Sequence, residues 1–387
     1  MGNNHFDFLI IGGGFAGCAL AHYLAKSQIK VLLLEANSIC SGTSAACAGR
    51  AQIIESETID YLKLVHQGFS RLPDLDEELN TDLEWETCGH LTLIYNEDEW
   101  NQQAGLVQKL NNLGIHASML DQSELNKLEP NINTKDCLGA AFSQEGHLNP
   151  FKFCFGFANS ARKNGAEIII NAPVSGFIKQ NNRISGVKVG QTTYSADTII
   201  LATGAWTGLL AENLDVHIPI SHTHAEAIVS EKLPRIINHH IGVSGFYDAV
   251  HGDQRLVTLG FGQHQSGSFV ISNAIQPEQK INLQSSNWGM PAIAKSFLKI
   301  IPQLKAIRVL RTWAAPSSFS SDHLPIIGKL PNHENVYITA GFHLAIPTIP
   351  YFAEKFVESL LFSNNLVSSF LEPFSINRFS QKVLTKG

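Results

Sequence analysis

FLIIGGGFAGCALAHYLAKSQIKVLLLE, residues Phe8 to Glu35, decides the fold of this chain. An apolar run is followed by a glycine turn, an Ala/Leu-rich helical pattern, a second apolar run and an acid. This order predicts strand, turn, helix and strand, with a G-x-G-x-x-G fingerprint at Gly12, Gly14 and Gly17. The first glycine permits a tight turn, the second lets backbone approach a pyrophosphate, and the third lets helix and strand pack closely. The stretch therefore predicts a dinucleotide site.

The two ends of this unit offer complementary groups to a dinucleotide. The helix N-terminus presents free N–H groups and the positive end of the helix dipole to the phosphates. Glu35 ends the second strand, where a carboxylate can accept hydrogen bonds from both ribose hydroxyls of an adenosine. No Arg or Lys directly follows Glu35, which disfavours a 2′-phosphate and therefore NADP.

Composition limits the class of protein. The chain has 387 residues, of which 44% are hydrophobic and 16% charged, so we expect a well-packed protein of two domains. A net charge of −6 is not the positive excess that is typical of nucleic-acid-binding proteins. No apolar run is long enough to span a bilayer. The six cysteines lack metal-ligand spacing and indicate a reduced, cytoplasmic setting, with peripheral attachment to an inner membrane left open. The close histidine pairs His222/His224 and His239/His240 lack a third ligand, so no metal is expected.

Two further segments have the composition of ligand-contacting backbone. Residues 37–52 are rich in Gly, Ser and Ala, which is typical of a loop pressed against a ligand. The strand expected over 198–201 runs into Ala202-Thr203-Gly204-Ala205-Trp206, where small residues allow backbone to approach a flat cofactor.

The remaining elements indicate two interleaved domains. Residues 1–55, 140–210 and 311–387 are expected to form the nucleotide domain, and 56–139 and 211–310 a separate, largely antiparallel sheet domain. Periodicity predicts helices over 57–80, 97–113, 151–164, 290–300 and Pro350–Phe362. It predicts strands over 89–95, 166–170, 187–189, 198–201, 227–229, 255–259, 268–271 and 336–340.

The chain resembles the D-amino-acid oxidase (DAO) family of FAD-dependent oxidoreductases, in particular the bacterial branch with glycine oxidase, sarcosine oxidase beta subunits and D-amino-acid dehydrogenases. The resemblance covers nearly the whole chain. It rests on 8–35, Ser41–Gln52, Gly89-His90-Leu91, 120–130, Gly146-His147-Leu148-Asn149-Pro150, Ala202–Trp206, Arg311-Thr312-Trp313-Ala314 and 322–328. It implies an α/β fold in which a Rossmann-like FAD-binding domain of glutathione-reductase type is interleaved with a mainly antiparallel β-sheet substrate domain.

The resemblance also implies the residues that bind the cofactor, FAD. The fingerprint would meet the pyrophosphate, Glu35 the adenosine ribose, and Val174 the adenine, while Gly204 and Trp206 would lie near the flavin. The implied FAD residues are Gly12, Gly14, Phe15, Ala16, Gly17, Glu35, Ala36, Thr43, Ser44, Ala48, Gly49, Arg50, Ala51, Val174, Ala202, Thr203, Gly204, Trp206, Gly341, Phe342, His343 and Leu344.

Two departures from the family pattern affect the reaction. Residues 315–321 lack the Arg that commonly binds a substrate carboxylate in this family. The candidates for substrate contact are His222, Arg255, His264, Arg311 and His343, and Arg50 is a further replacement for the missing Arg. The glycine-rich turn before the last helix is shortened and keeps Gly341, with His343 either replacing a lost donor or packing in the loop.

The implied reaction is hydride transfer to flavin N5 with oxidation of a C–N bond. The substrate would be a small amino acid or amine: a D-amino acid, glycine, sarcosine or an opine-like N-substituted amino acid. Oxygen, a quinone or a partner subunit would accept the electrons. The alternative is a flavin-binding subunit or scaffold whose catalysis is weak or partner-dependent. NAD binding without flavin is disfavoured by the segment 202–206.

Overall fold

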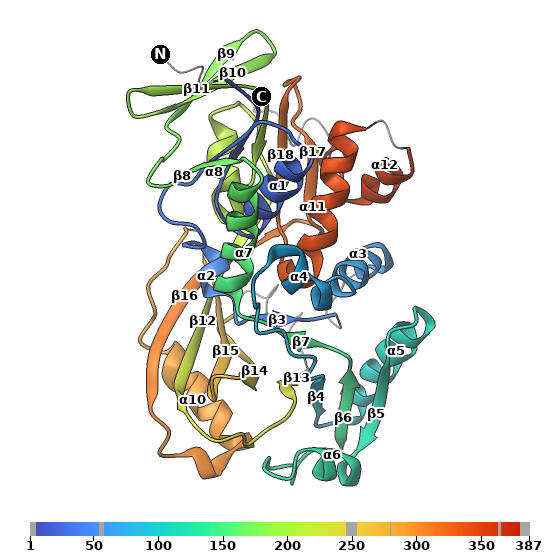
Figure 1. The fold of residues 1–387 in the computed structure, drawn as a ribbon. Coiled ribbons are helices and arrows are strands. Elements are labelled where there is room, and N and C mark those ends of the chain that lie inside the picture. Colours follow the sequence, from blue (N-terminus) through green and yellow to red (C-terminus); the bar gives the residue numbers. More distant parts are fainter. Residues whose placement is uncertain (1–4, 54–57, 245–253, 279, 363–364, 380–387) are drawn as a thin grey trace.

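The computed structural model describes residues 5–53, 58–244, 254–278, 280–362 and 365–379. It contains two eight-stranded sheets and one two-stranded ribbon. Figure 1 shows the first sheet and its helices in the upper half of the view and the second sheet in the lower half. Residues 1–4, 54–55, 363–364 and 380–387 of the expected nucleotide domain lie outside the described residues. So do residues 56–57, 245–253 and 279 of the expected sheet domain, which include the first residue of the helix expected over 57–80.

The first sheet is parallel around its centre. β1 pairs in parallel with β2 and β11, β11 with β18, and β2 with β8. The central strands are buried on both faces, which explains why they appear in the sequence as continuous apolar runs. Its strands are β1 (His5–Ile11), β2 (Val31–Leu34), β8 (Glu167–Ile169), β9 (Gly176–Gln180), β10 (Arg183–Val189), β11 (Thr192–Leu201), β17 (Ile326–Lys329) and β18 (Val336–Ala340).

Helices pack together on this sheet around fully buried aromatic side chains. Phe153 and Phe157 of α7 and Phe352 of α11 lie in one core with α1. The Asn149 side chain accepts from two backbone N–H groups at the start of α7, and Pro150 occupies the first turn, so the Asn-Pro pair begins this helix. The helices of this half are α1 (Phe15–Lys26), α2 (Thr43–Ala46), α3 (Ile59–Phe69), α4 (Leu75–Leu79), α7 (Pro150–Lys163), α8 (Thr207–Glu212), α11 (Ala345–Leu361) and α12 (Asn365–Leu371).

The second sheet runs in the order β16-β12-β15-β14-β13-β4-β6-β5 and is antiparallel except between β13 and β4. Helix α10 packs on it, with Phe297 edge-on to Phe261 at 5.0 Å between ring centroids. The strands are β4 (His90–Ile94), β5 (Ala117–Asp121), β6 (Gly139–Ser143), β12 (Ile220–Lys232), β13 (His240–Val243), β14 (Leu256–Gln263), β15 (Ser268–Pro277) and β16 (Val309–Ser320). The helices are α5 (Glu97–Asn112), α6 (Gln122–Leu128) and α10 (Gly289–Ile300). The expected fold class is confirmed.

Several boundaries differ from those expected. β6 and β16 belong to the second sheet, although 140–210 and 311–387 were expected in the nucleotide domain, because β16 pairs with β12 along its length and β6 lies between β4 and β5. The helix expected over 57–80 is broken by a 3₁₀ turn at Leu72–Asp74, where Pro73 has no N–H to continue the helical hydrogen bonds. The last long helix begins at Ala345 and holds Pro350 inside it.

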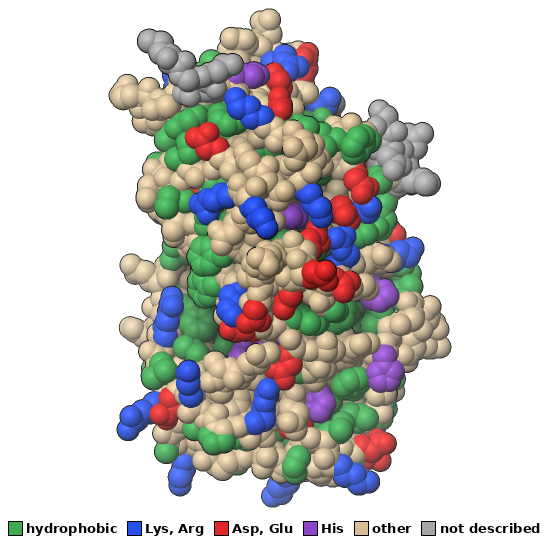
Figure 2. Space-filling view, in the orientation of Figure 1, with side chains coloured by type: hydrophobic (Ala, Val, Ile, Leu, Met, Phe, Trp, Pro, Cys, Tyr) green, Lys and Arg blue, Asp and Glu red, His purple; other side chains and the backbone are tan. Residues whose placement is uncertain are grey.

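The surface is mixed in charge. Figure 2 shows Lys and Arg side chains interspersed with Asp and Glu over the drawn face, without a continuous basic region. Within the described residues, no helix combines the length and apolarity needed to cross a bilayer.

Candidate cofactor and substrate site

A cavity of about 770 Å³ lies between the carboxyl ends of the first sheet and one side of the second. The chain leaves β1 towards β2 on one side and returns as β11 on the other, and this switch point is where open α/β sheets bind ligands. The volume of the cavity lies in the upper part of the range of roughly 300–1,000 Å³ found for ligand pockets.

The glycine turn forms one wall of the cavity. Gly12 has φ +112°, and a Cβ there would lie 2.4 Å from the Ala202 carbonyl oxygen. A Cβ at Gly17 would lie 1.9 Å from the Gly12 carbonyl oxygen, so this glycine permits close packing of α1 on the turn. Gly12, Gly14, Phe15 and Ala16 line the cavity, whereas Gly17 does not. The N-terminus of α1 therefore faces the cavity, as phosphate binding requires.

Glu35 lies at the same end of the cavity and is already oriented. Its Oε2 accepts from the Gly13 N–H at 2.6 Å and its Oε1 from the Asn37 N–H at 2.8 Å. A carboxylate has about four lone-pair directions, so acceptor capacity remains for a ligand. Ala36 and Val174 line the cavity beside it.

Hydrogen bonds link the loop after β2 to the second sheet. The Thr43 hydroxyl donates to the Pro316 carbonyl at 2.9 Å, and Trp313 Nε1–H donates to the Ala46 carbonyl at 2.9 Å. These bonds place the loop and β16 on the same cavity wall. The implied FAD residues Thr43, Ser44, Ala48, Arg50, Ala202, Thr203, Gly204 and Trp206 line it, and Gly49 and Ala51 do not.

The turn at Gly341 lies directly before α11. Gly341, with φ +77°, lines the cavity together with Phe342, His343 and Leu344, and so do Ala345, Ile346 and Ile349 of the helix. The Leu344 N–H donates to the Tyr61 hydroxyl at 3.3 Å, so this backbone donor is used inside the protein. The His343 ring packs near Tyr61 and Phe319, with centroid distances of 5.1 and 5.9 Å.

Arg50 is the only Lys or Arg among the described residues that lines the cavity. Its Nη2 lies 3.1 Å from His90 Nδ1 and 3.4 Å from the buried Glu145 carboxylate. Glu145 also accepts from the Ile53 N–H and the Ser143 hydroxyl, which hold it in place. Arg50 Nε is buried without a hydrogen-bond partner in the described part of the chain. Burial and the nearby Arg50 keep the pKa of His90 well below its ordinary value.

Of the substrate-contact candidates, His343 lines the cavity and four do not. His222 lies on β12 beside the lining residue Thr223. Arg255 stacks on Trp288 and Arg311 on Trp313, and both residues are exposed. His264 packs on His147 at 4.3 Å between ring centroids, and burial lowers the pKa of His147 to about 4 and that of His264 to about 3, so both rings are neutral.

The sequence did not indicate the wall contributed by the second sheet. Side chains on neighbouring strands face the cavity there, and most are small, which leaves room for a substrate. Glu226 also borders the cavity, but its carboxylate is buried and accepts from the Ser286 N–H at 3.1 Å. The residues of this wall are Thr223, Ala225, Glu226, Ala227, Ser272, Asn273, Ile275, Leu283, Trp313 and Ala315 to Ser318. Alternation of small residues on β12 is the signal that could have located it.

Comparison with known proteins agrees with this geometry. The model of the family described as FAD dependent oxidoreductase (DAO) matches residues 7–358. The chain belongs to this family. The resemblance, the FAD cofactor and the enzyme class expected from the sequence are thereby confirmed.

Three relatives of this DAO-family chain cover almost its whole length. The hydrogen cyanide synthase subunit HcnC of Pseudomonas protegens is 23% identical, over 99% of this chain and 98% of the relative. The sarcosine oxidase subunit beta of Arthrobacter sp is 27% identical, over 97% and 91%. The crystal structure of L-proline dehydrogenase from P. horikoshii has a TM-score of 0.87 at 23% identity, over 98% of both chains. The last likeness shows a shared fold.

The cavity of this family member fits FAD on its own geometry. It joins an N–H-rich helix N-terminus, a positioned strand-end carboxylate and a second wall of small residues in one continuous space. Gly12 and Gly14 bring no side chain of their own to the turn, and the Ser44 hydroxyl, which accepts from the Phe15 N–H at 3.2 Å, lies beside Gly14. Gly12 to Ala16 would hold the pyrophosphate, Glu35 the ribose, and Thr203 to Trp206 with Gly341 to Leu344 would border the flavin.

Glu35→Ala should lower the affinity for FAD by at least about tenfold, because each lost charge-assisted hydrogen bond contributes roughly 1.5–3 kcal/mol. Titration of apoprotein with FAD, followed by quenching of flavin fluorescence, gives the dissociation constant. Glu167→Ala removes an exposed carboxylate of the neighbouring β8 and should leave that constant unchanged. If the two variants have the same dissociation constant for FAD, Glu35 does not bind the cofactor, and its role is confined to its hydrogen bonds with Gly13 and Asn37.

Proposed function

We propose that the chain oxidises a C–N bond of a small amino acid or N-substituted amino acid: a D-amino acid, glycine, sarcosine or an opine-like compound. FAD, when bound, supplies the hydride acceptor. The observation that carries the substrate class is Arg50, the single Lys or Arg on the cavity wall within the described residues. A guanidinium presents two parallel N–H groups that match a carboxylate, whereas an amine without a carboxylate gains nothing from it.

The position of Arg50 supports this role. Its Nη1 lies 2.9 Å from where a Cβ of Gly260 would stand, so the absence of a side chain on β14 makes space for the guanidinium. Gly260 pairs with Ser272, which lines the cavity on β15. Arg50 therefore sits where the cofactor loop meets the second sheet. The Ala-rich wall beside it would exclude water from the reacting carbon and select a small substrate.

An anaerobic reduction panel tests the proposal. Purified protein with FAD would be mixed without oxygen with glycine, sarcosine, D-amino acids, D-proline and opines, and the flavin absorbance followed. We expect bleaching by at least one amino acid and much slower bleaching by the matched amine without a carboxylate, such as dimethylamine against sarcosine. Bleaching by the amine at an equal rate would contradict the role of Arg50.

One observation favours a second candidate, a flavin-binding subunit with partner-dependent catalysis. The Leu344 N–H is bonded to Tyr61, which leaves fewer backbone donors at the Gly341 turn to stabilise a reduced flavin. Two relatives bear names that describe them as subunits, HcnC and sarcosine oxidase subunit beta, and this supports a partner chain. Absence of bleaching by every amino acid in the panel would favour this candidate.

We propose a cytoplasmic location on the basis of cysteine chemistry. All six cysteines are free, and the buried Cys154 thiol donates to the Cys18 sulfur at 3.8 Å without a disulfide between them. Thiols persist where glutathione and thioredoxin keep them reduced, which supports a cytoplasmic location.

A further inference from the structure

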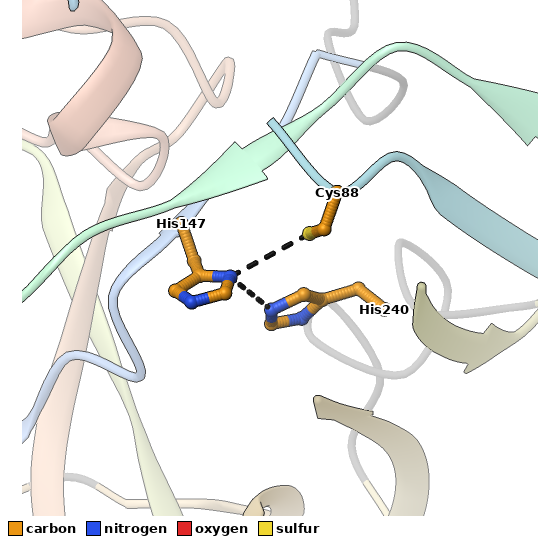
Figure 3. Close-up of side chains that lie close together, drawn as sticks. All are labelled: Cys88, His147 and His240. Atoms are coloured by element: carbon orange, nitrogen blue, oxygen red, sulfur yellow. Dashed lines mark hydrogen bonds between the residues drawn. The ribbon is translucent and has the colours of Figure 1, made fainter. Parts of the chain in front are cut away.

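A cluster of metal-ligating side chains lies outside the cavity wall. Cys88, just before β4, His147 on β7 (Gly146–His147) and His240 at the start of β13 point towards one another (Figure 3). The Cys88 sulfur lies 3.5 Å from His147 Nδ1, which lies 3.2 Å from His240 Nε2. All three ligand atoms fall within 4.8 Å of one another. No spacing in the sequence revealed this group, because its members come from three distant segments.

Two of the three separations match the edges of a tetrahedral zinc site, and the third, between the Cys88 sulfur and the His240 nitrogen, is within 4.8 Å. With Zn–S near 2.3 Å and Zn–N near 2.05 Å, tetrahedral angles place two nitrogens about 3.3 Å apart and a sulfur about 3.6 Å from a nitrogen. The observed distances of 3.2 and 3.5 Å lie within a fraction of an ångström of both values.

Hydrogen bonding alone satisfies this group poorly. The Nδ1 atom of His147 carries either one lone pair or one N–H, depending on the tautomer, yet the Cys88 thiol and the His240 ring both approach it. In either tautomer, Nδ1 makes one well-directed hydrogen bond, and its contact with the other neighbour is then poorly satisfied. A cation between the three atoms would accept the lone pairs of all of them.

A carboxylate lies on the outer side of the His147 ring. Glu86 Oε2 is 3.4 Å from His147 Nε2 without a hydrogen bond between them, and the other Glu86 oxygen is held by Arg235 at 2.9 Å. A proton on Nε2 would face this carboxylate and would leave Nδ1 free as a ligand. His147 and His240 are 2% and 3% exposed, so the arrangement is built into the protein interior.

A further histidine lies beside the cluster, although its nitrogens do not fall within the 4.8 Å that the three ligand atoms share. The His264 ring lies 4.3 Å from His147 and 5.9 Å from His240 between ring centroids. Its Nε2 is buried without a hydrogen-bond partner among the described residues. Cys88 is partly exposed, which gives an ion a route of entry.

We propose that Cys88, His147 and His240 bind one zinc ion, or a divalent ion with the same preference for thiolate and imidazole, with His264 or water completing four-coordination. Binding forms a metal–sulfur bond and releases the thiol proton to solvent. The ion would join the segment before β4, the ribbon of β3 (Arg50–Ala51) with β7, and β13. His147 pairs with Arg50 across that ribbon, so the ion would act as a structural support for Arg50.

Metal analysis and cobalt substitution test the proposal. Protein purified with zinc available should retain one zinc ion per chain. After removal with a chelator, Co²⁺ should restore one ion per chain, with a sulfur-to-cobalt charge-transfer band and ligand-field bands at longer wavelength than oxidised flavin. Wild-type protein that neither retains zinc nor gives the cobalt spectrum would overturn the proposal and leave a hydrogen-bond network.

Variants assign the ligands. Cys88→Ser should remove the charge-transfer band, and His147→Gln or His240→Gln should weaken metal binding by at least tenfold. Cys137→Ser and His22→Gln change a buried cysteine and a buried histidine elsewhere and should retain the full metal content. A Cys88→Ser protein with an unchanged cobalt spectrum would contradict the site. If a variant fails to fold, the wild-type spectrum alone decides.

Discussion

Gly17→Ala should yield a protein that does not retain FAD and is less stable. A methyl group at this position would lie 1.9 Å from the Gly12 carbonyl oxygen, far inside the 3.0 Å that real Cβ atoms respect. Helix α1 would have to move away from the turn, and both the turn and the helix N-terminus line the cavity. Overpacking costs roughly 1–3 kcal/mol or more. Flavin content after purification and the denaturant midpoint measure both effects.

Gly105→Ala is the matched control, because it adds the same methyl group to a helix with nothing within 4 Å. It should keep full FAD content and gain up to about 1 kcal/mol, since alanine favours the helix. A Gly17→Ala protein with normal FAD content would show that α1 need not pack closely on the turn.

Arg50→Ala should reduce kcat/KM for an amino-acid substrate roughly 100-fold or more, because two charge-assisted hydrogen bonds of about 1.5–3 kcal/mol each are lost. The matched amine without a carboxylate should lose much less. The ratio of kcat/KM between the two substrates therefore measures carboxylate recognition separately from stability. Arg50→Lys should recover part of the activity, since an ammonium keeps the charge without the two-pronged geometry.

Glu145→Gln is the control for the structural part of this effect. It weakens the ion pair of Arg50 but leaves the guanidinium and the other hydrogen bonds to residue 145 in place. In this variant, the ratio of kcat/KM between the amino acid and the matched amine should stay near the wild-type ratio. A ratio that collapses equally in Glu145→Gln, or stays unchanged in Arg50→Ala, would show that Arg50 acts through packing.

The cofactor half was predictable from the sequence because its constraints are local. Gly17 and Glu35 contact neighbours within one strand–turn–helix–strand unit, so residue type and spacing were sufficient to predict their positions, whereas the close contact of Gly12 is with Ala202 at the end of β11. Helices whose sequences contain strong capping residues were also predicted close to their observed bounds. The helix expected over 97–113 is α5, Glu97–Asn112, where Asn96 accepts from Glu99 N–H as the N-cap.

The substrate wall and the histidine cluster depend on long-range pairing, which spacing does not encode. Ala225 faces the cavity because β12 lies between β15 and β16, and the position of β16 became evident only from its pairing. Likewise Cys88, His147 and His240 meet only because β4 pairs with β13 and β7 pairs with β3. His264, a candidate for substrate contact, belongs beside this cluster for the same reason.

The cavity between the two sheets should bind FAD. An absorbance spectrum of the purified chain, followed by chromatography of the cofactor released on denaturation, tests this directly. We expect an oxidised flavin spectrum and release of intact FAD, bound without a covalent link. Released FMN, or a chain that takes up no flavin after incubation with excess FAD, would contradict it.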